Sequence, residues 1–345
     1  MDHVTNCFID LAFPPVIFGS TSLGNFYESV PEHVHQSIVS EWFQRTNGTV
    51  VIDSAGKYGA GLALENIARC LSTLNVAPDD VIISNKLGWR RVPLKGNEQG
   101  FEPGVWVDLK YDAELDISYD GILRCHEQGC ELLGDYRPQL LSVHDPDEYL
   151  AAATDEADLK SRWDDIAGAY QALTELKQKG EVLGLGVGAK NWTTIREFTN
   201  RFELDWVMIA NSFTLHSHPG ELVDYLTSLH ERNIKVINSA LFNGGFLVGS
   251  EFYNYQPIDP ASAKGADLIE WRENFRELCK LHDVLPAHAC IEFGASHPAI
   301  DSIALSSSKV NRVVSNVEFA SKKLPREFWD AMRTEGVVAA DYKFI

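Results

Sequence analysis

The chain has 345 residues, of which 45% are hydrophobic and 23% charged, and its formal net charge is −19. This composition is typical of a globular protein with a sizeable core, and the length suits one large α/β domain or two smaller ones. An acidic chain without a basic cluster repels nucleic acid and anionic membrane surfaces, so we expect neither as a partner.

The first residues predict neither secretion nor membrane insertion. Residues 1–11 include Asp2 and Asp10, and they lack the basic start and the apolar core of a signal peptide. No apolar run approaches the ~20 residues of a membrane helix. The six cysteines have neither zinc-binding nor Cys-x-x-Cys spacing, which indicates buried reduced thiols. We therefore expect a cytoplasmic protein.

Short apolar segments alternate with segments of helical periodicity along the chain. After a lead-in over residues 1–15, the predicted strands cover residues 16–18, 49–53, 81–86, 140–144, 182–188, 206–210, 234–239 and 301–306. The predicted helices cover residues 31–45, 61–74, 118–133, 162–179, 193–201, 221–231, 267–281, 287–295, 309–320 and 325–334.

This alternation indicates parallel strands joined by helices. Eight such units in this length favour an α/β fold of the closed (β/α)8 (TIM) barrel type over an open dinucleotide-binding sheet. No shift in composition marks a second domain. We therefore predict a single barrel domain over residues 1–345, closed by a C-terminal helix and tail over residues 322–345.

Two long connections interrupt the alternation, one after the third strand (residues 87–115) and one after the seventh (residues 240–264). Both are rich in glycine, and the first contains Trp89 and Trp106. A long stretch without regular structure inside a compact domain is usually functional or disordered. Because the first one follows a strand with a charged end, we interpret these connections as substrate loops.

Three of the predicted strands end on an ionisable residue. Strand 49–53 ends at Asp53, strand 81–86 at Lys86 and strand 140–144 at His144, and Tyr58 follows Asp53 by five residues. At the C-terminal ends of parallel barrel strands these side chains would share one site. Each residue alone has a commoner structural role as a cap, a solvated strand end, a packing residue or a core histidine. Their order on successive strand ends is what indicates chemistry.

A tyrosine, a lysine, an aspartate and a histidine can together move a proton. The ordinary pKa of tyrosine is about 10. A nearby ammonium favours the phenolate and lowers this pKa, so we expect Lys86, held by Asp53, to lower the pKa of Tyr58. His144 could orient a substrate oxygen while hydride leaves or joins its carbon. The hydride requires a nicotinamide, because no side chain supplies one.

The sequence resembles the aldo-keto reductase family over nearly its whole length. Residues 53–59 (Asp-Ser-Ala-Gly-Lys-Tyr-Gly), 85–88 and 143–147 are similar to motifs of that family. With residues 118–122 and 241–247, the last motif resembles more closely the branch of L-fucose (D-threo-aldose) and D-galactose 1-dehydrogenases. The resemblance implies NAD or NADP and no metal. It makes Tyr58 the general acid/base, Asp53 and Lys86 its tuning residues, and His144 the orienting residue.

The same resemblance implies a reaction. A lactol hydroxyl at C1 of an aldose would lose its proton to Tyr58 and its hydride to the cofactor, which gives an aldonolactone. Trp89 could stack on a sugar face, and an aromatic plug over the barrel mouth is an equally good role for it. An NADPH-dependent reductase of small aldehydes or ketones is the alternative within the family.

The resemblance also predicts a cofactor site, with departures from the family pattern. Lys190 stands where the family often has a carboxamide-binding Asn, so that Asn191 is the candidate one residue later. Ala210 and Ser239 stand where a Gln and a stacking Tyr are common. Hydroxyls, backbone amides and a helix N-terminus near residues 306–316 would bind the pyrophosphate. The candidate cofactor residues are Gly24, Asn191, Ser239, Leu241, Gly244, Leu247, Ser306, Ser307, Ser308, Arg312 and Asn316.

The choice between NAD and NADP stays open at this stage. Arg312 and Lys309 could meet a 2′-phosphate, and Arg312 could instead stack on adenine or remain a surface charge. Ser306 stands where NADP-preferring relatives often have a basic residue.

Two other functions are compatible with a barrel. A non-enzymatic nucleotide-binding barrel would need no proton donor, and the complete set of catalytic residue types argues against it. A metal-dependent hydrolase or lyase would need several histidine or carboxylate ligands at the strand ends. The remaining strand ends offer Gly188, Ala210, Ser239 and Ser306, which are poor ligands.

Overall fold

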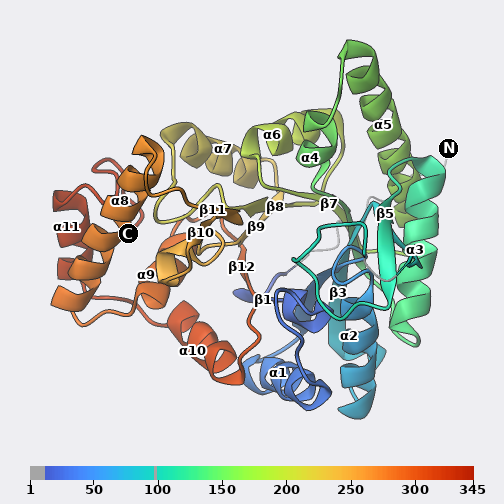
Figure 1. Cartoon of the computed structure of the whole chain (residues 1–345), viewed down its shortest axis with the longest axis horizontal. Helices are drawn as coiled ribbons and strands as arrows, with labels where there is room; N and C mark the ends of the chain where they lie inside the picture. The colour runs from blue at the N-terminus through green and yellow to red at the C-terminus, as the bar shows by residue number, and fades with distance from the viewer. Residues whose placement is uncertain (1–11, 97–98) are drawn as a thin grey trace.

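The computed structural model describes residues 12–96 and 99–345 (Figure 1). The barrel strands are β1 (Val16–Gly19), β2 (Val50–Ala55), β3 (Val81–Leu87), β6 (Leu140–His144), β7 (Gly184–Ala189), β8 (Trp206–Ala210), β9 (Lys235–Ser239) and β12 (Ser302–Leu305). All neighbouring pairs are parallel, and the order β1-β12-β9-β8-β7-β6-β3-β2 closes on itself. The predicted (β/α)8 barrel is therefore confirmed.

Helices surround this barrel on its outer side (Figure 1). They are α1 (Glu32–Arg45), α2 (Leu62–Thr73), α3 (Tyr119–Leu133), α4 (Pro146–Ala151), α5 (Glu156–Gln178), α6 (Trp192–Arg201), α7 (Gly220–Glu231), α8 (Ala263–Leu281), α9 (Pro286–Gly294), α10 (Val310–Ser321) and α11 (Arg326–Thr334). Within the described ranges, none of them has the length and apolar character needed to cross a membrane.

Two helices differ most from the prediction, and a third, α8, begins four residues before its predicted start at residue 267. Helix α5 begins at Glu156, six residues before the predicted start at residue 162. Asp155 caps the observed start by accepting a hydrogen bond from the Asp158 amide. This first part is exposed, so it lacks the apolar periodicity that marked the rest of the helix. Helix α4 was not predicted at all, because six residues are too few to establish a period.

Side-chain alternation along the strands decides what faces the inside of the barrel. One separate hydrophobic cluster consists of Ile17, Val51, Leu140, Trp206, Met208 and Ile237, with Ile82 packed against it. On β7, Gly186 leaves the space that the Trp206 ring fills, since a Cβ there would overlap the ring. Residues spaced by an even number from members of this cluster face the same interior, and they include Asp53, Lys86 and His144.

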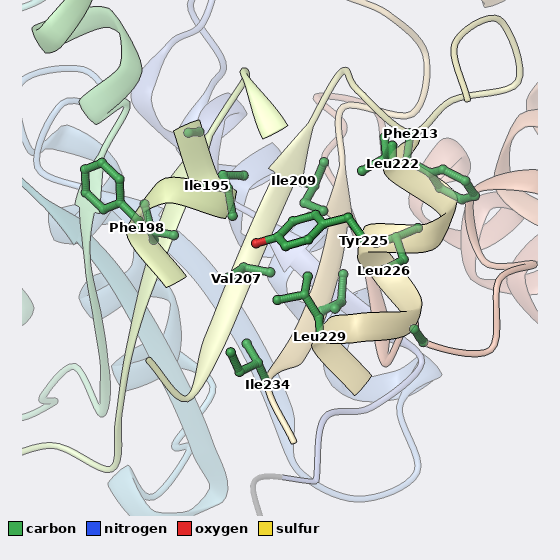
Figure 2. Close-up of a cluster of buried hydrophobic side chains, with 14 of the residues drawn as sticks. Ile195, Phe198, Val207, Ile209, Phe213, Leu222, Tyr225, Leu226, Leu229 and Ile234 are labelled. Carbon is green, nitrogen blue, oxygen red and sulfur yellow. The ribbon is translucent and has the colours of Figure 1, made fainter. Parts of the chain in front are cut away.

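The outer layer is close-packed between the strands and the helices. Figure 2 shows the part between α6, α7 and β8, where the side chains of Ile195, Phe198, Val207, Ile209, Leu222, Tyr225, Leu226 and Leu229 meet. The Tyr225 hydroxyl lies 3.0 Å from the Thr199 hydroxyl, so the buried phenol is paired. This packing fixes β8, whose last residues reach the barrel mouth.

The two long connections lie where they were predicted, but the expectation that they lack regular structure was wrong. The first contains the antiparallel hairpin β4 (Trp89–Pro93) and β5 (Tyr111–Leu115), beside α3 in Figure 1. The second contains a 3-10 turn, η3 (Phe246–Val248), and a short hairpin, β10 (Phe252–Tyr253) and β11 (Gln256–Pro257). These strands pair only with each other and are largely exposed, so they lack the continuous apolar runs of the barrel strands.

Candidate active site

The strand ends bring Asp53 and Lys86 into contact inside the barrel. The prediction ended the two strands at these residues. In the structure β2 and β3 continue to Ala55 and Leu87, so Asp53 and Lys86 lie within the strands. The Lys86 ammonium lies 2.5 Å from Asp53 Oδ2, and both side chains are buried. Gly188 on β7 leaves room for the lysine stem, because a Cβ there would lie 3.3 Å from Lys86 Cδ.

Tyr58 is held beside this ion pair by the loop that follows β2. Gly24 allows the loop after β1 to pack on the tyrosine backbone, since a Cβ on Gly24 would lie 2.8 Å from the carbonyl carbon of Tyr58. The Lys86 ammonium is 4.8 Å from the centre of the Tyr58 ring. The His144 ring lies 5.5 Å from the same ring at 82°, edge to face. The structure thus gathers all four predicted catalytic side chains at one end of the barrel.

Burial dominates the proton affinities of this group. We expected Lys86 to lower the pKa of Tyr58, but the pKa of Tyr58 is raised well above its ordinary value. Burial is the main cause, and the negative charges of Asp53 and Asp145 add to it. Burial also raises the pKa of Asp53, against the opposing effect of Lys86. The phenol is therefore protonated at neutral pH, as a proton donor must be.

His144 is a neutral imidazole at neutral pH. Its pKa is lowered well below the ordinary value by burial and then by the positive charges of Lys86, Lys57 and Lys190. Its Nδ1 atom has no hydrogen-bond partner among the described residues, and Nε2 lies 3.7 Å from Asp145 Oδ2. A neutral imidazole can donate one hydrogen bond and accept another, which suits the orientation of a substrate oxygen.

A group of charged side chains that the sequence analysis did not bring together lies next to His144. We call it the charged cluster, and its members are Lys57, Glu102, Asp145, Glu148 and Lys190. The Lys57 ammonium lies 2.7 Å from Glu102 Oε1, and the Lys190 ammonium lies 2.5 Å from Glu148 Oε1. Their meeting depends on four separate loops and on α4, so no sequence pattern marks it. Only the place of Lys57 directly before Tyr58 was a signal.

The loop between β4 and β5 folds back toward Tyr58. The Tyr27 amide donates to the Val105 carbonyl at 2.7 Å, and Phe26 and Trp106 form an isolated antiparallel bridge. The Trp106 ring lies 5.7 Å from the Tyr58 ring. Trp89 is partly buried, 5.1 Å from the Lys57 ammonium. This arrangement places two indole rings near the candidate catalytic residues.

Comparison with known proteins identifies the family to which the chain belongs. The model of the aldo/keto reductase family matches residues 15–334. The chain belongs to the aldo/keto reductase family. It is therefore an NAD(P)-dependent oxidoreductase that acts on small compounds such as sugars or aldehydes.

Two curated relatives of this aldo/keto reductase are similar along nearly their whole length. Pyridoxal 4-dehydrogenase from Microbacterium luteolum is 26% identical over 334 residues, with 93% of each chain covered. D-threo-aldose 1-dehydrogenase from a Pseudomonas species is 25% identical over 331 residues, with 92% of this chain and 93% of the relative covered. The second relative is one of the branch that the sequence resembles.

Solved structures share the fold. An aldo-keto reductase from Bacillus halodurans in its holo form superposes with a TM-score of 0.66 at 18% identity, covering 95% of this chain and 93% of that chain. A glycerol dehydrogenase from Gluconobacter oxydans superposes with a TM-score of 0.65 at 17% identity, covering 98% and 97%. At such identities the likeness shows the barrel architecture.

Hydroxyl and amide donors of this aldo/keto reductase lie near α10, where the pyrophosphate and ribose are predicted to bind. Ser306, Ser307 and Asn316 line a cavity between β1 and α10. The Lys309 side chain does not cap α10, and the Arg312 amide donates to the Lys309 carbonyl at 3.0 Å. The amides of Val310 and Asn311 have no backbone partner among the described residues and suit a phosphate. Ser308 is partly buried, and Arg312 is exposed on α10. The assignment of these residues to the cofactor stays a prediction.

The other candidate cofactor residues have visible structural roles. The Asn191 side chain caps α6 by accepting from the Thr193 amide at 3.0 Å. The Ser239 hydroxyl donates to the Ile209 carbonyl. The remaining four are Leu241 and Leu247, which are buried, Gly24, which packs on the Tyr58 backbone, and Gly244, where an added Cβ would lie 2.7 Å from the Tyr255 amide. Contacts from these residues to a cofactor would come mainly from their backbones.

One amide that sequence reasoning missed fits the polar end of a nicotinamide. Asn211 follows β8 directly, where Ala210 had left no amide at the expected position. Its side chain is buried, and within residues 12–96 and 99–345 neither its oxygen nor its nitrogen finds a hydrogen-bond partner. A buried amide is costly without partners, so Asn211 is suited to bind a carboxamide at this end of the barrel.

Proposed function

We propose that this enzyme oxidises C1 of an aldose of the L-fucose (D-threo-aldose) type to the aldonolactone, with Tyr58 as the general base. The observation that carries the proposal is the composition of the site around Tyr58 and His144. Two indole rings and a cluster of charged donors and acceptors surround one proton-transfer group. Indole faces suit the apolar faces of a sugar ring, and charged groups suit its hydroxyls. The relative that is a D-threo-aldose 1-dehydrogenase supports the proposal.

The residues of the chain divide the reaction between them. His144, as a neutral imidazole, hydrogen-bonds the C1 oxygen and holds it toward the Tyr58 phenol. The C1 hydroxyl proton moves to the Tyr58 oxygen as the C1–O bond gains double-bond character. The transfer requires the Tyr58 phenolate. The Lys86 ammonium, held by Asp53, places a positive charge 4.8 Å from the centre of the Tyr58 ring. A bound nicotinamide would supply the acceptor for the hydride that leaves C1.

The test is a spectrophotometric assay for reduced cofactor with NAD or NADP and a panel of L-fucose, D-arabinose, L-galactose and D-galactose at pH 9. An alkaline pH is chosen because burial raises the pKa of Tyr58 and the base form is needed. Growth of reduced cofactor with one or more of these sugars, and formation of the lactone, is the expected result. A flat panel with both cofactors would overturn the proposal.

A second candidate reaction is the oxidation of pyridoxal, because one relative is a pyridoxal 4-dehydrogenase. The Trp106 ring, 5.7 Å from Tyr58, could also stack on a pyridine ring. Pyridoxal therefore belongs in the same panel. Reduction of simple aldehydes with NADPH would instead identify a general carbonyl reductase. Cofactor binding without turnover of any compound would identify a nucleotide-binding barrel.

A further inference from the structure

One carboxylate oxygen in the charged cluster is approached by three possible donors without a close contact to any of them. Asp145 Oδ2 lies 3.7 Å from His144 Nε2, 3.9 Å from Lys57 Nζ and 3.5 Å from Lys190 Nζ. None of the side-chain hydrogen bonds found in the described parts of the chain has the Asp145 carboxylate as its acceptor. Polar atoms at such separations are commonly bridged by a further oxygen.

The two lysines are already neutralised by other carboxylates. Lys57 has Glu102 at 2.7 Å, and Lys190 has Glu148 at 2.5 Å. Two ammonium groups and three carboxylates leave the charged cluster with one negative charge in excess, counted as two minus three. The cluster therefore does not favour an anionic substrate, and a neutral group that both donates and accepts hydrogen bonds suits it best.

The position of the free carboxylate is fixed by its backbone. Asp145 links β6 to α4 with a left-handed φ of 46°, and its amide donates to the Gly188 carbonyl at 3.0 Å. The Lys57 side chain is only 6% exposed, so its ammonium is held as well. Groups held in advance in this way bind a matching partner with little loss of conformational freedom.

We propose that Asp145, Lys57 and Lys190 bind the hydroxyl groups that neighbour the reacting carbon and thereby select hydroxylated substrates. A hydroxyl in this position donates a hydrogen bond to the Asp145 carboxylate and accepts one from a lysine ammonium. The position follows from His144, which orients the reacting oxygen and lies next to Asp145 in the chain. This inference rests on the proposed function, because it assumes that the reacting carbon lies between Tyr58 and His144.

The charged cluster should discriminate strongly against substrates that lack the neighbouring hydroxyl. A substrate without the neighbouring hydroxyl leaves the Asp145 carboxylate, whose side chain is only 13% exposed, without a close partner. Sites that hydrogen-bond a substrate hydroxyl can discriminate by several powers of ten. A site that only held a sugar against the indole rings would discriminate far less. The preference for a sugar over its deoxy analogue therefore measures the contribution of the charged cluster.

The experiment compares kcat/KM for the best aldose of the panel and for its 2-deoxy analogue. The variants are Asp145→Asn, which keeps the volume and tolerates a left-handed φ, and Lys57→Met, which keeps the length of the side chain. Glu41→Gln on the surface of α1 is the matched control. Binding of the sugar, measured by quenching of tryptophan fluorescence, provides a readout that does not depend on turnover.

We expect the wild-type enzyme to prefer the aldose by at least about 100-fold, and Asp145→Asn and Lys57→Met to reduce this preference by about tenfold or more. Affinity for the sugar should fall in parallel, while kcat/KM for the 2-deoxy analogue changes little. An equal loss on both substrates would overturn the inference, because it would mean that the residues act on His144 or on folding alone.

Failure of the proposed function gives a different result. In that case the wild-type enzyme oxidises no aldose, and the same variants are compared in the reduction of glycolaldehyde and acetaldehyde. A preference for glycolaldehyde that Lys57→Met removes would retain the inference without the sugar reaction. The absence of any such preference in the wild-type enzyme would overturn both.

Discussion

At the scale of single residues, Asp53 and Lys86 depend on each other because both are buried. Lys86→Met should lower the free energy of unfolding by about 3–5 kcal/mol, since it leaves the Asp53 carboxylate buried without its partner. Adding Asp53→Asn should recover much of this loss, while activity stays low in both variants. Urea denaturation and turnover are measured side by side. Equal stability of the single and double variants would contradict the coupling.

Tyr58 is expected to matter for turnover and little for folding. Tyr58→Phe removes the proton donor and keeps the ring against Trp106 and His144, so turnover should fall by about 10²–10⁴-fold. Cofactor affinity, measured by fluorescence titration, should change less than twofold. The matched control is Tyr111→Phe on the exposed strand β5. Turnover near the wild-type level in Tyr58→Phe would remove this residue from the mechanism.

The pH dependence of the oxidation rate should reflect the titration of Tyr58 and not that of His144. Burial raises the pKa of Tyr58, so the rate of oxidation should increase with pH across the alkaline range as the phenolate forms. The pKa of His144 is lowered well below its ordinary value, so it stays neutral and should give no inflection near pH 6.5. The measurement is kcat/KM between pH 5 and 10. An inflection near pH 6.5 that disappears in His144→Asn would contradict the neutral state of His144.

At the scale of elements, the barrel strands could be predicted and their accessory hairpins could not. Buried parallel strands give continuous apolar runs, and such runs marked all eight. Strands β4 and β5 pair with each other at the surface, so their sequence carries no such run. The same division holds in the site. Asp53, Lys86 and His144 were found because strand ends converge, whereas the charged cluster depends on loop conformations such as the left-handed Asp145.

Strand β7 should be intolerant of a methyl group at Gly186. A Cβ at this position would overlap the buried Trp206 ring, so Gly186→Ala should destabilise the protein by about 1–3 kcal/mol. Gly220→Ala at the start of α7 is the control, because a Cβ there meets no atom within 4 Å. Thermal unfolding followed by circular dichroism compares the two. Equal melting temperatures would mean that Trp206 does not fill the interior as described.

At the scale of the whole molecule, the excess of carboxylates and the buried histidines both bear on acid stability. The pKa values of His216 and His297 are lowered to about 4, in both cases mainly by burial. Above pH 6.5 these residues are neutral in the folded and the unfolded protein. Below pH 6.5 these histidines bind protons in the unfolded chain, whereas in the folded protein they stay neutral until about pH 4. Stability should therefore fall as the pH drops from 6.5 to 4.

His297 contributes part of this effect. It is 2% exposed and packs against Phe213 and Phe344. A pKa of about 4 in place of 6.5 corresponds to ~3 kcal/mol at pH 4. His297→Asn can still accept the hydrogen bond from the Ala299 amide but cannot titrate, so its free energy of unfolding should depend less on pH over this window. Urea denaturation at pH 7, 6 and 5 measures the slopes, with His33→Asn on the exposed side of α1 as the control. A slope in His297→Asn equal to that of the wild-type protein would show that other groups cause the acid destabilisation.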